Sequence, residues 1–354
     1  MALISSKQKT NIFRLVLIFI IIITIILFFA YYIVTYHKSS ILSGYKKPLE
    51  LPGYSNFSIN WNNNPRGVIV TLIRSTNRSI ARVINMIHSV ILFHSTNDNF
   101  QYPFLLFHDH NFTLALRQQI LSCVRYNNKT IQISFVLLNF ETNVQQSNKF
   151  SKSHPSGYRL MCRFWSYDVF YHPAIVYGNY DYIMRMDDDS YFIDKTNIDL
   201  FQYIDREKFD YVYRSWYRED NNALFVIEKT FLNRTLPRVT CIYNNFFIIR
   251  LQWFYRSERI QRYLHEFIRD DFILREYVGD GCIHAAMLEI DQRVRVKHLT
   301  QISYGHNYHI MLLNQKSYFF NYVKEFEQRI LNSCHQLIVI YGRKAEVKQV
   351  TMKE

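Results

Sequence analysis

Short apolar runs alternate with helical patterns over residues 65–140, and this alternation most constrains the fold. Three runs have the composition of buried strands: 67–73, 104–107 and 131–138. Apolar residues recur at helical spacing between Ile80 and Ile91, and residues 112–124 are also helical in pattern. Strands that alternate with helices usually form a parallel sheet covered by helices. We therefore expect an α/β domain.

Three consecutive carboxylates, Asp187, Asp188 and Asp189, end a further apolar run at residues 180–186. Adjacent carboxylates repel each other, and a hard cation such as Mg²⁺ or Mn²⁺ would offset that repulsion through carboxylate oxygens. Ligands of open α/β sheets bind at the carboxyl ends of strands, where Arg74 is also expected. The acidic turn is therefore either a solvated loop or a metal site for a nucleotide diphosphate.

The chain has 354 residues and a formal net charge of +13, which suits a partner that carries phosphates. It contains no GxGxxG or GxxxxGK[ST] sequence, so the usual dinucleotide fingerprint and the P-loop are excluded. It also lacks zinc-finger spacing and RNA-binding motifs. We expect no nucleic-acid partner and attribute the positive charge to an anionic donor substrate.

Other polar residues each allow two interpretations. Arg159 and Arg163 share a face of a helix expected at 158–173, where they either clamp phosphates or form a solvated basic face. Asp280 lies between two glycines at a helix start, as an N-cap or as a carboxylate that faces a sugar. His306 is either a ligand of a Mn²⁺-class ion or an ordinary surface or core histidine.

Residues 15–34 are apolar and uncharged, and about 20 such residues span a bilayer. We expect an uncleaved type II anchor rather than a signal peptide, whose apolar region is shorter. The expected divisions are a cytoplasmic tail (1–14), a transmembrane signal-anchor (15–34), a stem (35–64), a catalytic domain (65–340) and a loose tail (341–354).

The five cysteines lie at positions 123, 162, 241, 282 and 334, without metal-binding spacing. An oxidising compartment would permit one or two disulfides and at least one free thiol, and full reduction is the alternative. We expect Cys162 to be a disulfide member. Asn-x-Ser/Thr sequences agree with a secretory location and occur at Asn56, Asn77, Asn111, Asn128 and Asn233.

Several of these segments together resemble the fungal-type Golgi α-1,2-mannosyltransferases, glycosyltransferase family 15. The similar segments, in order, are Tyr158–Phe164 (YRxMCRF in the family), Tyr182–Asp189 (YWRVEPDV), Phe254–Glu258 (FFRSE), Gly279–His284 (GDAPVH) and Tyr304–His306 (GYxH). The order is kept over about residues 65–310.

The resemblance implies a GT-A-like (Rossmann-like) fold, GDP-mannose as donor, Mn²⁺ as cofactor and retention at the anomeric carbon. It implies Asp187 and His306 as metal ligands, and Tyr158 and Asp280 in the active site. Two departures are clear. The family has Glu-Pro-Asp where this chain has three aspartates, and Phe247 replaces a glutamate that we associate with the family's active site.

We therefore predict a retaining transferase that moves mannose to a mannose-containing glycan on a glycoprotein, in α-1,2 linkage, at the luminal side of the Golgi membrane. The alternatives are a relative that uses another nucleotide sugar and a catalytically dead, membrane-anchored sugar-binding protein. The predicted site residues are Tyr158 and Asp280 (catalytic), Arg74, Arg159, Arg163 and Asp188 (donor binding), and Asp187, Asp189 and His306 (metal).

Overall fold

The computed structural model divides into two units, Met1–Ile59 and Asn60–Glu354. It describes residues 23–25, 65–94, 102–124, 131–140, 154–219, 229, 232–233, 239–269, 271–307, 309–311, 317–319 and 348–349. Within these residues, no helix has the length and apolar character needed to span a membrane. The anchor expected at 15–34 lies outside the described residues, apart from the helical residues 23–25.

A seven-stranded sheet forms the centre of the described part of the second unit, in the order β10-β6-β9-β4-β1-β2-β3. Its strands are β1 (Gly67–Ile73), β2 (Phe104–His108), β3 (Ile133–Leu137), β4 (Tyr182–Met186), β6 (Tyr211–Tyr213), β9 (Phe246–Arg250) and β10 (Val296–His298). The strands β1 to β4 pair in parallel, as the alternating pattern predicted.

The sheet is nevertheless mixed, because β9 runs antiparallel to both β4 and β6. The chain reaches β9 from a hairpin of β7 (Trp216–Glu219) and β8 (Val239–Ile242), and Phe246 lies opposite Met186 at the end of β4. Since the chain enters the sheet at its carboxyl edge there, β9 must run the other way. The alternating pattern carried no information on the direction of this strand.

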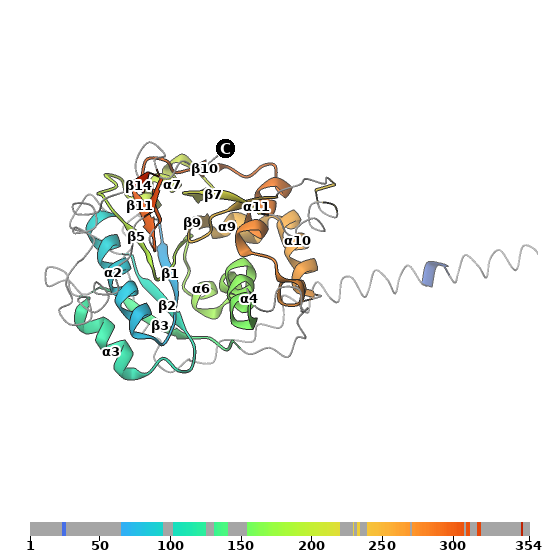
Figure 1. The fold of residues 1–354 in the computed structure, drawn as a ribbon. Helices are drawn as coiled ribbons and strands as arrows, with labels where there is room; N and C mark the ends of the chain where they lie inside the picture. Colours follow the sequence, from blue (N-terminus) through green and yellow to red (C-terminus); the bar gives the residue numbers. More distant parts are fainter. Residues whose placement is uncertain are drawn as a thin grey trace, which may run out of the picture. The chain divides into compact units, whose positions relative to one another are not determined.

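Helices cover both faces of the sheet (Figure 1). One face packs on α2 (Asn77–Phe93), α3 (Leu114–Cys123) and α7 (Leu200–Glu207). The other packs on α4 (Ser156–Arg163), η2 (Phe164–Asp168), α5 (Val169–Tyr171), α6 (Pro173–Val176), α9 (Leu251–Arg256), α10 (Glu258–Arg269), η3 (Ile273–Tyr277) and α11 (Asp280–Ile290). Alternate residues of β1 enter the two cores, Val68 on one face and Ile69 on the other. The result is a three-layer α/β domain.

Local sequence signals set several helix ends. The Thr76 side chain accepts a hydrogen bond from the Ser79 N–H at 3.2 Å and caps α2. The helical segment from 156 ends at Tyr171, and Pro173 begins the short α6. The backbone is extended at Ser257, and this separates α9 from α10.

A second sheet extends the acidic turn. Among the described residues its order is β14-β13-β12-β11-β5, with β5 (Ser190–Phe192), β11 (Tyr304–His306), β12 (His309–Met311), β13 (Ser317–Phe319) and β14 (Lys348–Gln349). The pairing of β5 with β11 places His306 opposite Ser190, directly after the acidic turn. The strand β14 lies within the tail that we expected to be loose.

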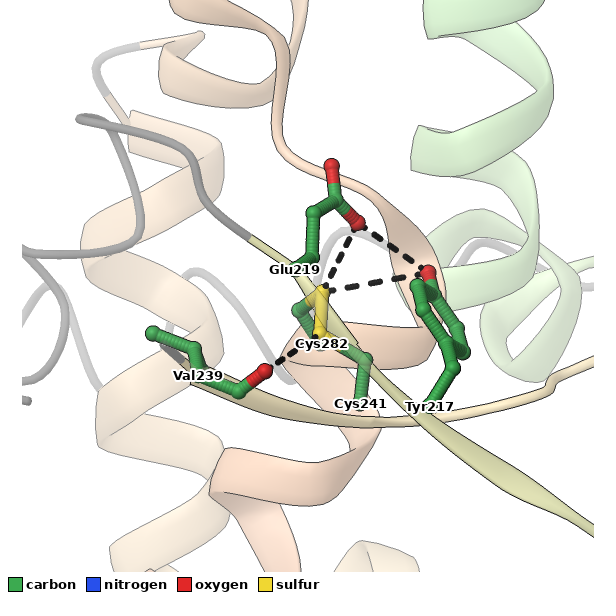
Figure 2. Close-up of a disulfide and its surroundings, with 5 residues drawn as sticks. All are labelled: Tyr217, Glu219, Val239, Cys241 and Cys282. Atoms are coloured by element: carbon green, nitrogen blue, oxygen red, sulfur yellow. Dashed lines mark hydrogen bonds between the residues drawn. A yellow bond between two sulfur atoms is a disulfide. The ribbon is translucent and has the colours of Figure 1, made fainter. Parts of the chain in front are cut away.

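The disulfide between Cys241 and Cys282 joins β8 to α11 (Figure 2). Cys123 is disulfide-bonded as well, whereas Cys162 is a free, buried thiol. The expected combination of disulfides with a free thiol is therefore confirmed, but the choice of Cys162 as a disulfide member was wrong. Its side chain is fully buried in the core beneath α4.

Candidate active site

A cavity of about 640 Å³ opens where β1 and β4 end. Arg74 from the end of β1 and Asp187 from the end of β4 both line it, so the two strand ends meet as predicted. Other walls come from α4, the β7–β8 hairpin, α11 and β11. Of the predicted site residues, the lining includes Arg74, Tyr158, Asp187, Asp188, Asp189, Asp280 and His306.

Asp187, Asp189 and His306 converge at the floor of the cavity, each with one potential ligand atom within 4.8 Å of the others. His306 Nε2 lies 3.0 Å from Asp189 Oδ1 and 3.8 Å from Asp187 Oδ2. His306 Nδ1 is 2.9 Å from the Tyr243 hydroxyl, which can accept a hydrogen bond from Nδ1–H and so leave Nε2 as the nitrogen that would bind a metal ion. Two carboxylates and one imidazole fit a Mn²⁺-class ion.

Electrostatics inside this cluster favour a cation. Burial lowers the pKa of His306, but the carboxylates of Asp189 and Asp187 outweigh it and raise that pKa overall. Arg82 Nη1 also donates to Asp189 Oδ2 at 2.8 Å, which offsets part of the negative charge. The cluster therefore attracts positive charge to the point where the three ligand atoms meet.

Asp188 lines the same cavity but has a different partner. Its carboxylate accepts a hydrogen bond from the Ser79 hydroxyl in the first turn of α2. Burial raises the pKa of Asp188, and the neighbouring Asp189 and Asp187 charges add to the rise. Its neighbours on either side thus belong to the candidate metal-binding cluster, while Asp188 fixes the turn against α2.

Arg185, which the sequence analysis missed, joins the candidate metal-binding cluster to Asp280. Its Nε donates to Asp187 Oδ1 at 2.8 Å, and its Nη1 forms an ion pair with Asp280. Its guanidinium lies 4.1 Å above the Trp165 ring, and the side chain is only 3% exposed. An arginine inside a buried strand needs anionic partners, and Asp187, two positions on, shares its face. An arginine inside an apolar strand, with an aspartate two positions on, was the sequence feature that could have identified Arg185.

Asp280 does not act as the N-cap of α11. The N-cap is Gly279, without a side-chain hydrogen bond, and Asp280 is the first helical residue. Its carboxylate lines the cavity, where it accepts from Asn244 Nδ2 at 3.0 Å as well as from Arg185. The alternative in which this carboxylate faces the substrate is therefore the one that the geometry favours.

Arg159 and Arg163 do not reach the cavity. The fully buried Arg159 guanidinium donates to the main-chain carbonyls of His154, Leu274 and Arg275 at 2.7–2.9 Å. Arg163 forms ion pairs with Asp271 at 2.8 Å and with Asp168 at 3.3 Å. The predicted phosphate clamp is corrected accordingly: these two arginines brace the packing of α4.

Phe247 lies in the core rather than on a cavity wall. It is opposite Arg185 in the sheet and fully buried. Its ring stacks on Tyr211 with 5.6 Å between centroids, and the His284 ring lies 4.9 Å away. No carboxylate is available at this position, as the sequence departure indicated.

The strand β7 and the turn between β8 and β9 supply wall residues that sequence reasoning did not single out. Tyr217 comes from β7, and Tyr243, Asn244 and Asn245 come from the turn before β9. The only local signal was the polar pair of asparagines between two apolar runs.

The mixed sheet with an acidic turn at the end of β4 resembles the GT-A-like fold of solved glycosyltransferases. The particular relatives are mannosyltransferases. The fold is similar to that of Ktr4p from Saccharomyces cerevisiae, with a TM-score of 0.57 and 18% identity over 70% of this chain and 71% of that chain. It is also similar to core-mannan synthase A from Aspergillus fumigatus in its Mn/GDP form, with a TM-score of 0.54 and 16% identity over 70% and 76%.

Sequence similarity points to the same group. A stretch of 155 residues is 26% identical to the probable mannosyltransferase KTR4 of Saccharomyces cerevisiae and covers 40% of this chain. The match spans about a third, 32%, of that relative. No protein-family model matches the chain. The resemblance indicated by the motifs is thus confirmed as homology to Ktr4 mannosyltransferases at low identity.

Proposed function

We propose that this chain transfers mannose from GDP-mannose to a hydroxyl of a mannose-containing glycan, with Mn²⁺ as cofactor. The observation that carries the proposal is the meeting of Asp187, Asp189 and His306 in one cavity at the end of β4. Ktr4p has been solved in complex with GDP, and core-mannan synthase A in a Mn/GDP form. An α-1,2 linkage and retention of configuration complete the proposal.

The donor end of the cavity comprises Asp187, Asp189, His306, Arg74 and Asp188. The first three would hold Mn²⁺, which when bound stabilises the negative charge of the leaving diphosphate. Arg74 is exposed at the end of β1, where it can reach a phosphate oxygen. Asp188 holds the acidic turn on α2 and forms part of the wall beside the nucleotide.

The acceptor end comprises Tyr158, Tyr217 and Asp280 on the opposite walls. Phe247 offers no nucleophile, and Asp280 is engaged by both Arg185 and Asn244. We therefore favour front-face substitution over a covalent intermediate. The bond between the anomeric carbon and the phosphate oxygen breaks, the acceptor oxygen bonds to the same face of that carbon, and the departing phosphate takes the acceptor proton.

A donor screen tests the proposal with the full chain in detergent. Release of free nucleotide is measured for GDP-mannose and for other GDP- and UDP-sugars, with Mn²⁺ or with a chelator. We expect GDP release from GDP-mannose that depends on Mn²⁺. Preference for another nucleotide sugar would support a relative with a different donor, and binding without turnover would support a catalytically dead sugar-binding protein.

The cellular setting is a further part of the proposal. Residues 15–34 would anchor the chain in the Golgi membrane, with the catalytic part in the lumen. Residues beyond 40 should then be protected from protease in sealed vesicles. A secreted product that begins near residue 40 would exclude the anchor.

A further inference from the structure

The end of β2 adds a third charged residue to the edge of the sheet where the cavity opens. The strand β1 pairs in parallel with β4 on one side and with β2 on the other. Each of these strands is followed by a charged residue that lines the cavity: Asp187 after β4, Arg74 after β1 and Asp109 after β2. Since neighbouring strands lie about 4.8 Å apart, the end of β2 is roughly 10 Å from the end of β4.

The Asp109 carboxylate is held in place through one of its two oxygens. The Ser75 hydroxyl and the main-chain N–H of Asn111 both donate to Oδ1, each at 2.9 Å. Within the described part of the chain, no hydrogen bond or ion pair ends on Oδ2, and the residue is half-buried. A carboxylate oxygen can accept about two hydrogen bonds. Because Asp109 lines the cavity, Oδ2 can accept these from a ligand bound there.

The four other carboxylates of the cavity lining already have partners. Asp187 and Asp189 belong to the candidate metal-binding cluster, Asp188 accepts from a serine of α2, and Asp280 pairs with an arginine of β4. Among the described lining residues, Asp109 is thus the carboxylate with an oxygen still open for a ligand's hydrogen-bond donors.

Apolar side chains flank Asp109 on both sides. Leu72 comes from β1, and Phe140 lies three positions after β3, so the two strands that neighbour β2 both supply apolar lining. Both side chains are partly buried and pack on the same core. Apolar surface with one fixed polar group suits an aromatic base, whose faces are apolar and whose edge forms hydrogen bonds.

The spacing along the sheet edge fits a nucleotide. A ribose separates the base of a nucleotide from its phosphates, so a diphosphate held at Asp187 and Arg74 leaves the base near the end of β2. Guanine carries two adjacent donors on one edge, N1–H and the 2-amino group. Uracil offers one N–H between two carbonyl oxygens, which a carboxylate repels. The open oxygen of Asp109 therefore matches guanine better.

We infer that Asp109 recognises the guanine base of the donor, with Oδ2 accepting hydrogen bonds from N1–H and the 2-amino group. This inference rests on the proposed function and adds the residue that selects the base. In this arrangement the nucleotide lies along the sheet edge, with its diphosphate at β4, Arg74 in the middle and its base at β2.

Isothermal titration of the full chain in detergent, with Mn²⁺ and with GDP or inosine diphosphate, tests the assignment. Inosine diphosphate lacks only the 2-amino group of guanine. Because that group would bond a charged acceptor, wild type should bind GDP roughly 10- to 100-fold more tightly. Asp109→Asn should lose affinity for GDP and bind the two nucleotides nearly equally. Asp194→Asn, the same change at an exposed residue outside the cavity lining, is the matched control and should keep the wild-type preference.

Thermal melts accompany these titrations. If Asp109→Asn does not fold, Asp109→Glu replaces it, because the longer side chain keeps the charge but moves the carboxylate, and it should also weaken the preference. Equal affinity of wild type for GDP and inosine diphosphate would overturn the inference. So would a folded Asp109 variant that keeps the wild-type preference.

Two further outcomes separate the base from the ribose and this inference from the proposed function. Weaker binding of 2′-deoxy-GDP than of GDP by wild type, but not by Asp109→Asn, would assign Asp109 to the ribose and overturn the base assignment. If wild type prefers GDP through Asp109 but transfers no mannose, the transferase proposal fails and the base assignment stands. Transfer from GDP-mannose without discrimination against inosine diphosphate gives the reverse result.

Discussion

The donor end of the cavity is held by side chains at the edge of the central sheet, whereas the acceptor end rests on a hairpin outside that sheet. Asp187 and Asp189 follow β4 directly and are braced by Arg185 and Arg82. Tyr217 and Glu219 lie on a two-stranded hairpin that a disulfide ties to α11. The donor end is thus fixed by ion pairs and the acceptor end by a covalent bridge.

The largest expected effect is at the donor end. Asp187→Ala and Asp189→Ala should each reduce Mn²⁺-dependent transfer by about 10²–10³, because the leaving diphosphate loses electrostatic stabilisation. Asp188→Ala should have a smaller effect, because its carboxylate bonds Ser79 instead of joining the cluster. Rates at several Mn²⁺ concentrations beside thermal melts measure this difference. If all three variants lose transfer activity equally, and the thermal melts show that each is unfolded, the acidic turn has only a structural role.

Arg185 forms ion pairs at both ends of the cavity, with Asp187 at one and Asp280 at the other, so its removal should affect both ends. Arg185→Met leaves Asp187 and Asp280 without their shared cation and should cost about 3–5 kcal/mol of unfolding free energy. Adding Asp280→Asn should restore part of that stability, since one of the two unpaired charges is then gone. Urea denaturation of the single and double variants measures the coupling. If the effects of Arg185→Met and Asp280→Asn on the free energy of unfolding simply add, Arg185 does not couple the two carboxylates.

The disulfide should matter mainly to the acceptor end. Replacing both Cys241 and Cys282 by alanine opens a loop with a sequence separation of 41, which predicts a loss of about 4 kcal/mol at most. Transfer to methyl α-mannoside should fall more than hydrolysis of GDP-mannose. Cys123→Ala, which removes a disulfide at the end of α3 and away from the cavity lining, is the control and should preserve the ratio of the two rates. Equal loss of both activities would place the disulfide's role in general stability.

A smaller effect is expected on the pH dependence of stability, through His284 in the core. Burial lowers the pKa of His284 to about 4, so the unfolded chain binds a proton in the range where the folded chain does not. Stability is therefore complete above the unfolded pKa of about 6.5 and falls as the pH decreases toward 4. Between pH 7 and pH 5 the loss should be roughly 2 kcal/mol. Urea denaturation at both pH values, with His284→Gln as control, should show a steeper pH dependence in wild type.

The donor end was more predictable from the sequence than the acceptor end. Strand β1 and the acidic turn after β4 depend on residues that are neighbours in the chain, and the structure has them as expected. Helical spacing placed Arg159 and Arg163 on one face but gave no information about what that face meets. Arg159 instead meets carbonyls of the irregular η3 segment. Such partners depend on tertiary packing, as does the reversed direction of β9.

The position of Phe247 also limits how this site can change. A glutamate there would place a charge between the Tyr211 and His284 rings, in a part of the core where Phe247 itself is fully buried. The cation nearest in the sheet, Arg185, lies directly opposite but is already shared by Asp187 and Asp280, so a carboxylate at position 247 would compete with them for it. Because a buried carboxylate that is left without a full partner costs several kcal/mol, the single substitution should lower stability unless the neighbouring charges are rearranged with it. Chains with Phe and with Glu here are therefore separated by a coordinated set of substitutions rather than by a single step.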